Sequence, residues 1–246
     1  MKLYKYRKLT DAKDELSCDE LSRIKQILRT GAFWCAKPGS LNDEEEFVWM
    51  CSYTPSPFTE ELLATLLSRI RGWSQREAGV IVSTSIRRND LRRLVDPVVG
   101  AMIHQCRDSF GIACFGASPT NSTLWDRYGG KGVGVCIEVD VPDSLMGTQL
   151  HQVRYRHEKF IHVDTLLRSQ FDRDAAKELR DLALLSKSLK WDEEAEIRFL
   201  SKRQEVNVVI EGSRITSVIL GSSVPPHMWD EIKCLAGSIP IVSCKV

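Results

Sequence analysis

Apolar residues recur along the chain at two spacings, and the three-to-four-residue spacing predicts several amphipathic helices. In residues 17–31, four apolar side chains form one stripe, with Ser17 or Asp19 available as an N-terminal cap and Gly31 as the end. The same spacing predicts further helices at 59–73, at 76–108 with Pro97 as a break or first-turn residue, at about 163–189 and at 225–237. A helical insertion is therefore expected at about 55–108.

Alternating apolar and polar residues, many of them β-branched or aromatic, predict strands at the start, middle and end of the chain. These expected strands cover 3–7, 32–37, 111–118, 133–142, 151–156, 195–202, 205–212, 214–221 and 239–246. The strands and helices are mixed but do not alternate strictly, as they would in a doubly wound fold. We therefore expect an α+β fold: a single domain over residues 1–246, with one mixed, mostly antiparallel sheet and helical insertions.

The composition is that of an ordinary globular protein and excludes a strong global charge. The 246 residues are 43% hydrophobic and 27% charged, with a formal net charge of +1. The sequence has no apolar run of membrane-spanning length and no apolar stretch typical of a signal peptide at its start, so we expect a cytoplasmic protein with no membrane partner. One basic cluster, IRRNDLRR at 86–93, is explained by a solvated helix face or by contact with nucleic acid.

The eight cysteines show no metal-site or disulfide-framework spacing, because none occurs as CxxC and none has a histidine at zinc-finger distance. We expect most of them to be reduced, buried thiols. The five histidines are scattered along the chain, so no metal is expected.

Two glycine- and aromatic-rich segments are candidates for ligand contact, and each also has a structural interpretation. The segment YGGKGVGV at 128–135 lacks phosphate-loop and dinucleotide spacing. It is either a turn whose backbone approaches a ligand or a tight connection into a strand. On a helical turn, Trp125 and Tyr128 share a face, where they either stack on a base or nicotinamide ring or pack in the core.

The segment WDEEAEIR gives the clearest candidate chemistry. Read as a strand, it places Glu194, Glu196 and Arg198 on one face, opposite an apolar face of Ala195, Ile197 and Phe199. The two carboxylates would lie about 7 Å apart, and like charges at that distance disfavour each other unless a cation such as Arg198 intervenes. The alternative is an exposed edge strand with alternating charges.

These segments, in their order along the chain, resemble a bacterial family catalogued as domain of unknown function 2971. The family pattern has YKYR near the start, a loop with N-D-P-F-E, then CFS, MW-x-x-Y and G-v-c-I, and later W-x-x-E-x-E-x-R. The resemblance covers nearly the whole chain and rests on Tyr4, Tyr6, Arg7, Asn42, Asp43, Cys114, Phe115, Trp125, Tyr128, Gly134, Trp191, Glu194, Glu196 and Arg198. This chain departs from the pattern at Glu44, where proline is usual, and at Gly116, where serine is usual.

The order of the motifs is also similar to that in divergent ADP-ribosyltransferases, in which an Arg ends the first strand, a Ser-containing strand follows and a later E-x-E carries the catalytic Glu. This resemblance implies an ADP-ribosyltransferase-like fold and NAD⁺ as substrate, with Glu196 catalytic and Glu194 orienting the acceptor. It implies a cofactor-binding set of Arg7, Tyr6, Ser118, Trp125, Tyr128 and Arg198. In this set Arg7 would hold the pyrophosphate, and Ser118 would supply the hydroxyl that Gly116 lacks.

The same resemblance suggests a bacterial toxin or antiphage defence effector, with a protein or nucleic acid as acceptor and an antitoxin or defence-system partner. Two other functions stay open on the residues alone. One is a hydrolase that uses Glu194 and Glu196 as an acid/base pair on a nucleotide or glycosidic substrate. The other is a non-enzymatic module that binds a nucleotide or a partner, in which the two carboxylates only pair with Arg7 or Arg198.

Overall fold

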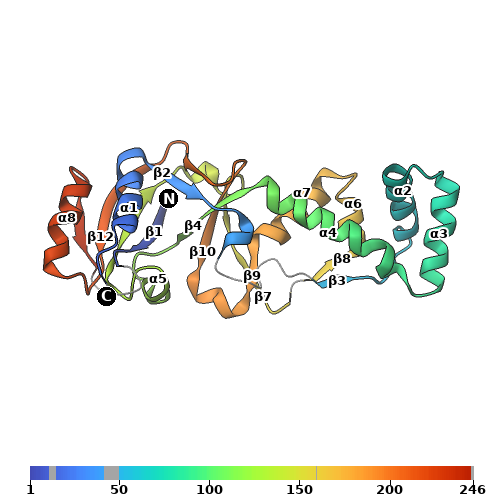
Figure 1. Cartoon of the computed structure of the whole chain (residues 1–246), viewed down its shortest axis with the longest axis horizontal. Coiled ribbons are helices and arrows are strands. Elements are labelled where there is room, and N and C mark those ends of the chain that lie inside the picture. The colour runs from blue at the N-terminus through green and yellow to red at the C-terminus, as the bar shows by residue number, and fades with distance from the viewer. Residues whose placement is uncertain (11–14, 42–49, 159, 245–246) are drawn as a thin grey trace. The chain divides into compact units, whose positions relative to one another are not determined.

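Most of the strands expected at the start, middle and end of the chain lie together in one seven-stranded sheet (Figure 1), whereas those expected at 32–37 and 205–212 pair with each other in a separate two-stranded sheet. A computed structural model describes residues 1–10, 15–41, 50–158 and 160–244. Unit 1 consists of Met1–Lys37, Phe110–Val153 and Lys190–Val246, and unit 2 of Pro38–Ser109 and Arg154–Leu189. The helical insertion expected at about 55–108 therefore lies inside unit 2, which also takes a later segment of the chain.

Unit 1 is built on the mixed, mostly antiparallel sheet that the sequence predicts. The strand order is β13-β12-β5-β1-β4-β10-β6, and within it β12 and β13 are parallel, whereas the other neighbouring strands are antiparallel. The strands are β1 (Lys2–Lys8), β4 (Gly111–Gly116), β5 (Gly134–Asp140), β6 (Leu150–Gln152), β10 (Glu196–Ser201), β12 (Arg214–Leu220) and β13 (Ile241–Ser243). The α+β class and the mixed sheet are confirmed.

Apolar side chains on alternate positions form the core on one face of this sheet, which we call the core face. They include Leu3, Ile137, Phe115, Ile197 and Phe199, all buried. The elements that cover this face are α1 (Cys18–Thr30), α8 (Pro226–Ala236) and the ribbon of β2 (Ala32–Cys35) with β11 (Val206–Val209).

Helix α1 begins and ends where the sequence predicts. The Ser17 side chain accepts a hydrogen bond from the backbone N–H of Glu20. Gly31 ends the helix with φ of 66°, a conformation that glycine adopts without steric cost.

The opposite face of the sheet, which we call the aromatic face, carries a smaller cluster. It contains Tyr4 and Tyr6 of β1 with Cys136 and Ile219, and it packs against Trp125 and its neighbours on the short helix α5 (Ser122–Arg127). Two 3₁₀ helices complete the unit, η2 (Asp143–Leu145) and η3, which begins in unit 2 and spans Leu189–Glu194.

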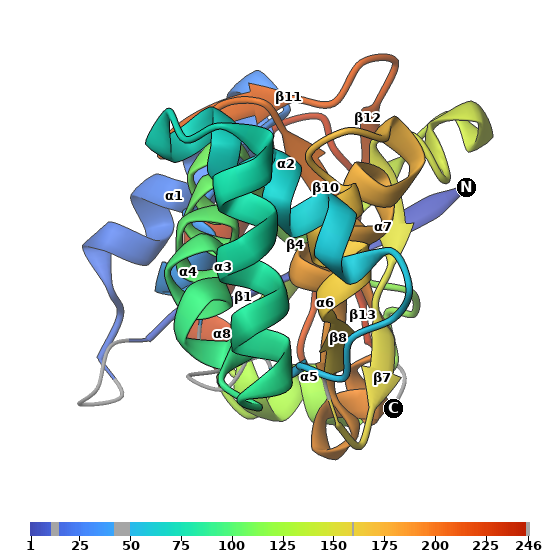
Figure 2. The same cartoon turned by 90° about the vertical axis from the view of Figure 1, so that its right-hand side faces the viewer.

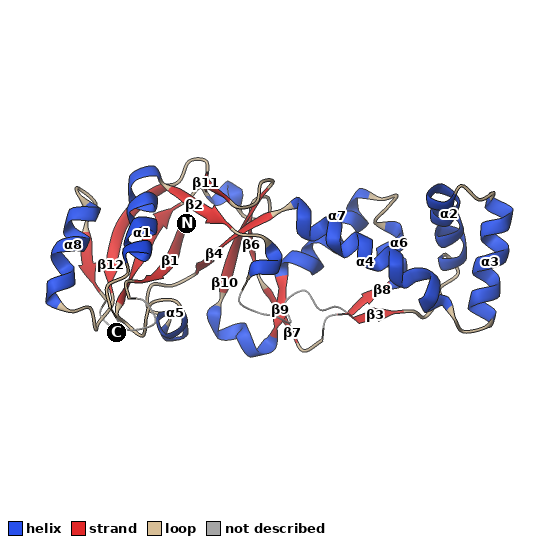
Figure 3. Cartoon of the chain, in the orientation of Figure 1, coloured by secondary structure: helices blue, strands red, loops and turns tan. Residues whose placement is uncertain are grey.

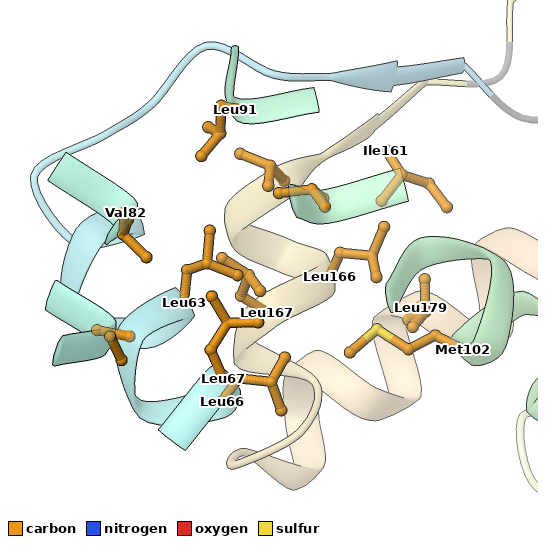
Figure 4. Packing of buried hydrophobic residues seen from close by; sticks show 14 residues of the cluster. Leu63, Leu66, Leu67, Val82, Leu91, Met102, Ile161, Leu166, Leu167 and Leu179 are labelled. Carbon is orange, nitrogen blue, oxygen red and sulfur yellow. The ribbon is translucent and has the colours of Figure 1, made fainter. Parts of the chain in front are cut away.

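Unit 2 is mostly helical (Figure 3). Its elements are η1 (Pro38–Ser40), β3 (Met50–Ser52), α2 (Thr59–Arg71), α3 (Gln75–Arg87), α4 (Leu91–Ser109), β7 (Arg154–Arg156), β8 (Phe160–His162), α6 (Val163–Arg168), α7 (Arg173–Leu185) and β9 (Ser186–Ser188). Helices α2 and α3 run side by side (Figure 2), and the leucines of α2 and α6 meet in one core (Figure 4). Two short parallel pairs, β3–β8 and β7–β9, connect to these helices.

Several expected boundaries are wrong. Pro97 lies in the interior of α4 and neither breaks the helix nor belongs to its first turn. The strand expected at 151–156 is divided at Val153 between β6 and β7. The helical block expected to run to 189 ends at Leu185, since β9 pairs with β7.

The cysteine expectation holds only in part. Among the described cysteine side chains, all of which are free thiols, only Cys35 and Cys136 are fully buried. Cys18 and Cys234 are exposed, so most of these thiols are not core residues. No described helix is long and apolar enough to cross a membrane. The described residues include no group of three or more His, Cys, Asp or Glu side chains placed to hold a metal ion.

Candidate functional site

The three segments that carry the candidate motifs are neighbouring strands, β1, β4 and β10. Gly116 of β4 is the ladder partner of Tyr4 on β1 and of Glu196 on β10. Because paired residues point to the same face, Tyr4 and Glu196 flank a position that has no side chain. A Cβ at Gly116 would lie 2.5 Å from Leu124 Cδ1, so helix α5 packs directly onto this glycine. The serine that the family pattern has here would not fit without movement of Leu124.

Arg7 does not join the other candidate residues. Successive strand residues point to opposite faces, so Arg7 lies on the core face whereas Tyr6 lies on the aromatic face. The Arg7 guanidinium pairs with Glu20 of α1, with Nη2 to Oε2 at 2.7 Å. Its Nε is buried and makes no hydrogen bond. Arg7, which the resemblance places in the cofactor-binding set, therefore lies on the other face of the sheet from Tyr6 and Glu196.

Glu194 and Glu196 do not sit together on one strand. Glu194 ends η3, Ala195 is exposed with φ of 45°, and β10 begins at Glu196. The left-handed conformation at Ala195 changes the direction of the chain, so the expected spacing of two residues along a strand does not apply. The alternation from Glu196 onward is confirmed, because Ile197 and Phe199 lie in the core.

Each carboxylate has a guanidinium among its partners. Glu194, 1% exposed, accepts hydrogen bonds at Oε1 from Arg127 Nη1 at 2.9 Å and from the Tyr128 hydroxyl at 3.1 Å. Glu196 accepts from Arg198 Nε at 2.9 Å and from Nη2 at 3.2 Å. Arg198 is 0% exposed, so this second pair is fully desolvated. Glu194 and Glu196 are therefore neither part of a solvated face nor an open pair of carboxylates.

Helix α5 and η3 are joined by a set of polar contacts, which we call the α5–η3 junction. Asn121 caps α5 and donates through Nδ2 to the Glu193 carbonyl at 2.7 Å. The Thr123 hydroxyl donates to Glu193 Oε2 at 2.9 Å. Arg127, which pairs with Glu194, also lies over the Trp191 ring at 4.2 Å. The junction therefore fixes Glu194 against Arg127, which remains partly exposed and forms the solvent side of this group.

The aromatic residues divide between core and surface. Trp125 is buried, meets Tyr6 edge-on with ring centroids 5.1 Å apart, and donates from Nε1 to the Pro119 carbonyl at 2.8 Å. Its ring is therefore a core ring, which is one of the two interpretations left open by the sequence. Tyr128 is only partly buried and bonds to Glu194.

Ser118 lies beyond the end of β4, two residues after Gly116. Its hydroxyl bonds to Thr120 Oγ1 at 3.0 Å and accepts from the Thr120 backbone N–H at 3.2 Å. Its carbonyl accepts the Tyr6 hydroxyl at 2.5 Å. Burial raises the pKa of Tyr6, so this hydroxyl stays protonated and holds the Ser118 turn. The described contacts of Ser118 are those of a local turn.

The glycine-rich segment is a tight connection. Gly130, Lys131 and Gly132 all have positive φ, between 54° and 86°. Gly134 then starts β5, and a Cβ there would lie 2.5 Å from the carbonyl oxygens of Arg7 and Gly129. The structure thus shows the close turn into a strand that one of the two interpretations predicts.

Lys5 belongs to none of the motifs, yet the structure places its amine inside unit 1. Strands β1 and β4 share a single ladder pair, and next to it Lys5 Nζ donates to the Cys114 carbonyl at 2.9 Å. The amine also lies 5.5 Å from the centre of the Phe115 ring, and burial lowers its pKa. In the sequence, Lys5 occupies a position of β1 that the alternation assigns to the core face, and a lysine at such a position indicates a buried amine.

We expect Lys5→Met to change how stability depends on pH. The folded protein binds the Lys5 proton less tightly than the unfolded chain, so this residue makes stability rise as the pH climbs from the lowered pKa toward 10.5. The gain from Lys5→Met in the free energy of unfolding should therefore shrink over that window, measured by urea unfolding at several pH values. Lys8→Met, at an exposed position of the same strand, is the control. A pH-independent difference for Lys5→Met would contradict this expectation.

Comparison of the chain with protein-family models, with curated proteins and with solved structures gave no match. The family resemblance stated above therefore stays a prediction. Its positions Asn42, Asp43 and Glu44 lie outside the described residues.

Proposed function

We propose that unit 1 transfers ADP-ribose from NAD⁺ to a macromolecular acceptor, and that its fold is ADP-ribosyltransferase-like. The observation that carries this proposal is the order of three neighbouring strands. The strand that contains YKYR, the strand that contains CFG and the strand that begins at the last residue of EAE are adjacent as β1, β4 and β10. These motifs lie far apart in the sequence, and the resemblance requires them to meet.

The chemistry fits the aromatic face, where Tyr6, Tyr128, Glu194 and Glu196 gather. Breaking the bond between nicotinamide and ribose leaves the bonding electrons on nicotinamide and creates an oxocarbenium-like ribose. A fixed carboxylate stabilises that positive charge. In this proposal NAD⁺ approaches through the partly exposed Arg127 and Tyr128, Glu196 stabilises the ribose, and Glu194 orients the acceptor.

One role in the resemblance has to change. Arg7 cannot hold the pyrophosphate at this face, because it lies on the core face and pairs with Glu20. Arg127 is the cation that the α5–η3 junction presents beside Glu194, so we assign the pyrophosphate to Arg127. The setting we propose is a bacterial toxin or antiphage defence effector acting in the cytoplasm, with a protein or nucleic acid as acceptor.

A second candidate is a module that binds a nucleotide without consuming it. The bidentate Glu196–Arg198 pair favours this candidate, because it occupies the carboxylate that the transferase needs. A hydrolase with a carboxylic acid/base pair is not favoured by the geometry, since Glu194 and Glu196 belong to different elements and each faces a guanidinium.

Release of nicotinamide from NAD⁺ tests the transferase. We expect the purified protein, supplied with cell lysate as a source of acceptor, to release nicotinamide, and Glu196→Gln to lower the rate about 100-fold or more. Tyr128→Phe removes one hydroxyl from a partly buried ring and serves as the milder variant, with a smaller loss. Circular dichroism and melting temperature establish that each variant is folded.

Three outcomes separate the candidates. Full turnover by folded Glu196→Gln would contradict its catalytic role. No nicotinamide release, combined with a rise in melting temperature on adding NAD⁺, would favour the binding module. If the protein releases no nicotinamide and its melting temperature does not change with NAD⁺, NAD⁺ is excluded as the ligand of this face.

A further inference from the structure

Unit 2 contains a pocket of about 490 Å³ that none of the motifs predicted. Its lining comes from one stretch of chain, through β7, β8, α6 and α7, so the pocket belongs to unit 2 alone. A volume of this size lies in the range of small-molecule sites. A ligand bound there would act independently of any NAD⁺ chemistry in unit 1.

One wall of the pocket is basic and aromatic. Arg154 and Arg156 alternate on β7, so their side chains point to the same side of that strand. Phe160 on β8 joins the lining and is 50% exposed, so its ring is accessible from the pocket. Arginine is the side chain that best matches a carboxylate, through two parallel hydrogen bonds.

The contribution of α7 to the lining is rich in acid. Asp174, Glu178 and Asp181 recur at spacings of four and three residues, so they share one face of the helix. Leu182 lies beside them and also packs against the unit 2 core. Lys177 is the single cation that α7 contributes to the lining.

Most of these charges are not used inside the protein. Within the described part of the chain, the side chains of Arg154, Arg156, Asp174 and Glu178 make no ion pair or hydrogen bond. Asp181 differs, since it pairs with Arg180. Unpaired charges of both signs thus line the same pocket. Ser186, the ladder partner of Arg154, is fully buried, and its hydroxyl has no hydrogen-bond partner.

We propose that this pocket binds a zwitterionic small molecule of the α-amino acid class. The ligand carboxylate pairs with Arg154 and Arg156, its ammonium pairs with Asp174 and Glu178, and an apolar side chain contacts Phe160 and Leu182. A ligand with only negative charge would face the unpaired carboxylates of α7, and one with only positive charge would face the two arginines. A molecule that carries both groups satisfies both walls.

Calorimetric titration of the full-length protein tests this proposal. The twenty common L-amino acids are screened in pools, and L-phenylalanine and L-leucine are titrated singly as apolar probes. For the amino acid that binds, we expect Arg154→Gln and Glu178→Gln each to weaken binding about tenfold or more, because each removes one partner of a charge-assisted hydrogen bond. The control Arg173→Gln, an exposed arginine of α7 outside the pocket lining, should bind within about twofold of the wild type.

Matched analogues of the ligand test the need for both charges. For L-phenylalanine these are 3-phenylpropionate, which lacks the amine, and phenethylamine, which lacks the carboxylate. Much weaker binding of both analogues than of the amino acid would support the proposal. Equal binding of either analogue, unchanged binding by Glu178→Gln, or failure of all twenty amino acids to bind would overturn it. None of these outcomes depends on nicotinamide release.

Discussion

Arg198→Met should lower the free energy of unfolding by about 3–5 kcal/mol, because it leaves the Glu196 carboxylate buried without its guanidinium. The methionine fills similar space, so the loss comes mainly from the charge and not from a cavity. Arg198 is fully buried and makes two hydrogen bonds to Glu196. Urea unfolding followed by circular dichroism measures the change.

The double variant Glu196→Leu with Arg198→Met separates the two explanations of such a loss. Replacing a whole buried ion pair by apolar side chains is often neutral or stabilising. We therefore expect the double variant to recover most of the stability that Arg198→Met loses. If the double variant is as unstable as the single one, packing of the arginine stem, and not the unpaired carboxylate, causes the effect.

Gly134→Ala should destabilise unit 1 by about 1–3 kcal/mol or more, because overpacking forces the backbone to shift. A Cβ at Gly134 would lie 2.5 Å from the carbonyl oxygens of both Arg7 and Gly129, and neither backbone group can rotate away. The shift would disturb the turn at 129–134 and the β1–β5 ladder together. The melting temperature and urea midpoint give the measurement.

Gly79→Ala is the matched control for this substitution. Gly79 lies inside α3, and a Cβ there would meet no atom within 4 Å. Alanine has a better helix propensity than glycine by about 1 kcal/mol, so this variant should be more stable than the wild type. Equal effects at Gly134 and Gly79 would mean that the close approach at Gly134 does not limit stability.

Local pattern predicted much of the fold because the features concerned are local. Alternation identified β1 and β5, and the apolar positions of β10 from Ile197 onward lie in the core as expected. Ser17 and Gly31 bound α1 because capping depends on a few neighbouring residues. The α+β class followed from these elements.

The candidate site was predicted less well, because it depends on contacts between distant segments. No local pattern brings Arg127 to Glu194 or Lys5 to the carbonyl of Cys114. The positive φ at Ala195 also carries no sequence signal, since alanine rarely adopts it. The separation of Arg7 from Tyr6 is a local feature, because consecutive residues of a strand point to opposite faces.

The position of β1 in the sheet has a consequence for synthesis of the chain. β1 lies inside the seven-stranded sheet, yet its neighbours begin at Gly111 and Gly134, so the ribosome makes it long before either partner exists. During that interval both of its edges are open to pairing with other nascent chains. Lysine and other charged residues are the usual protection of an open edge. Four of the seven residues of KLYKYRK are cations, and their mutual repulsion disfavours pairing between unpaired β1 strands of different nascent chains.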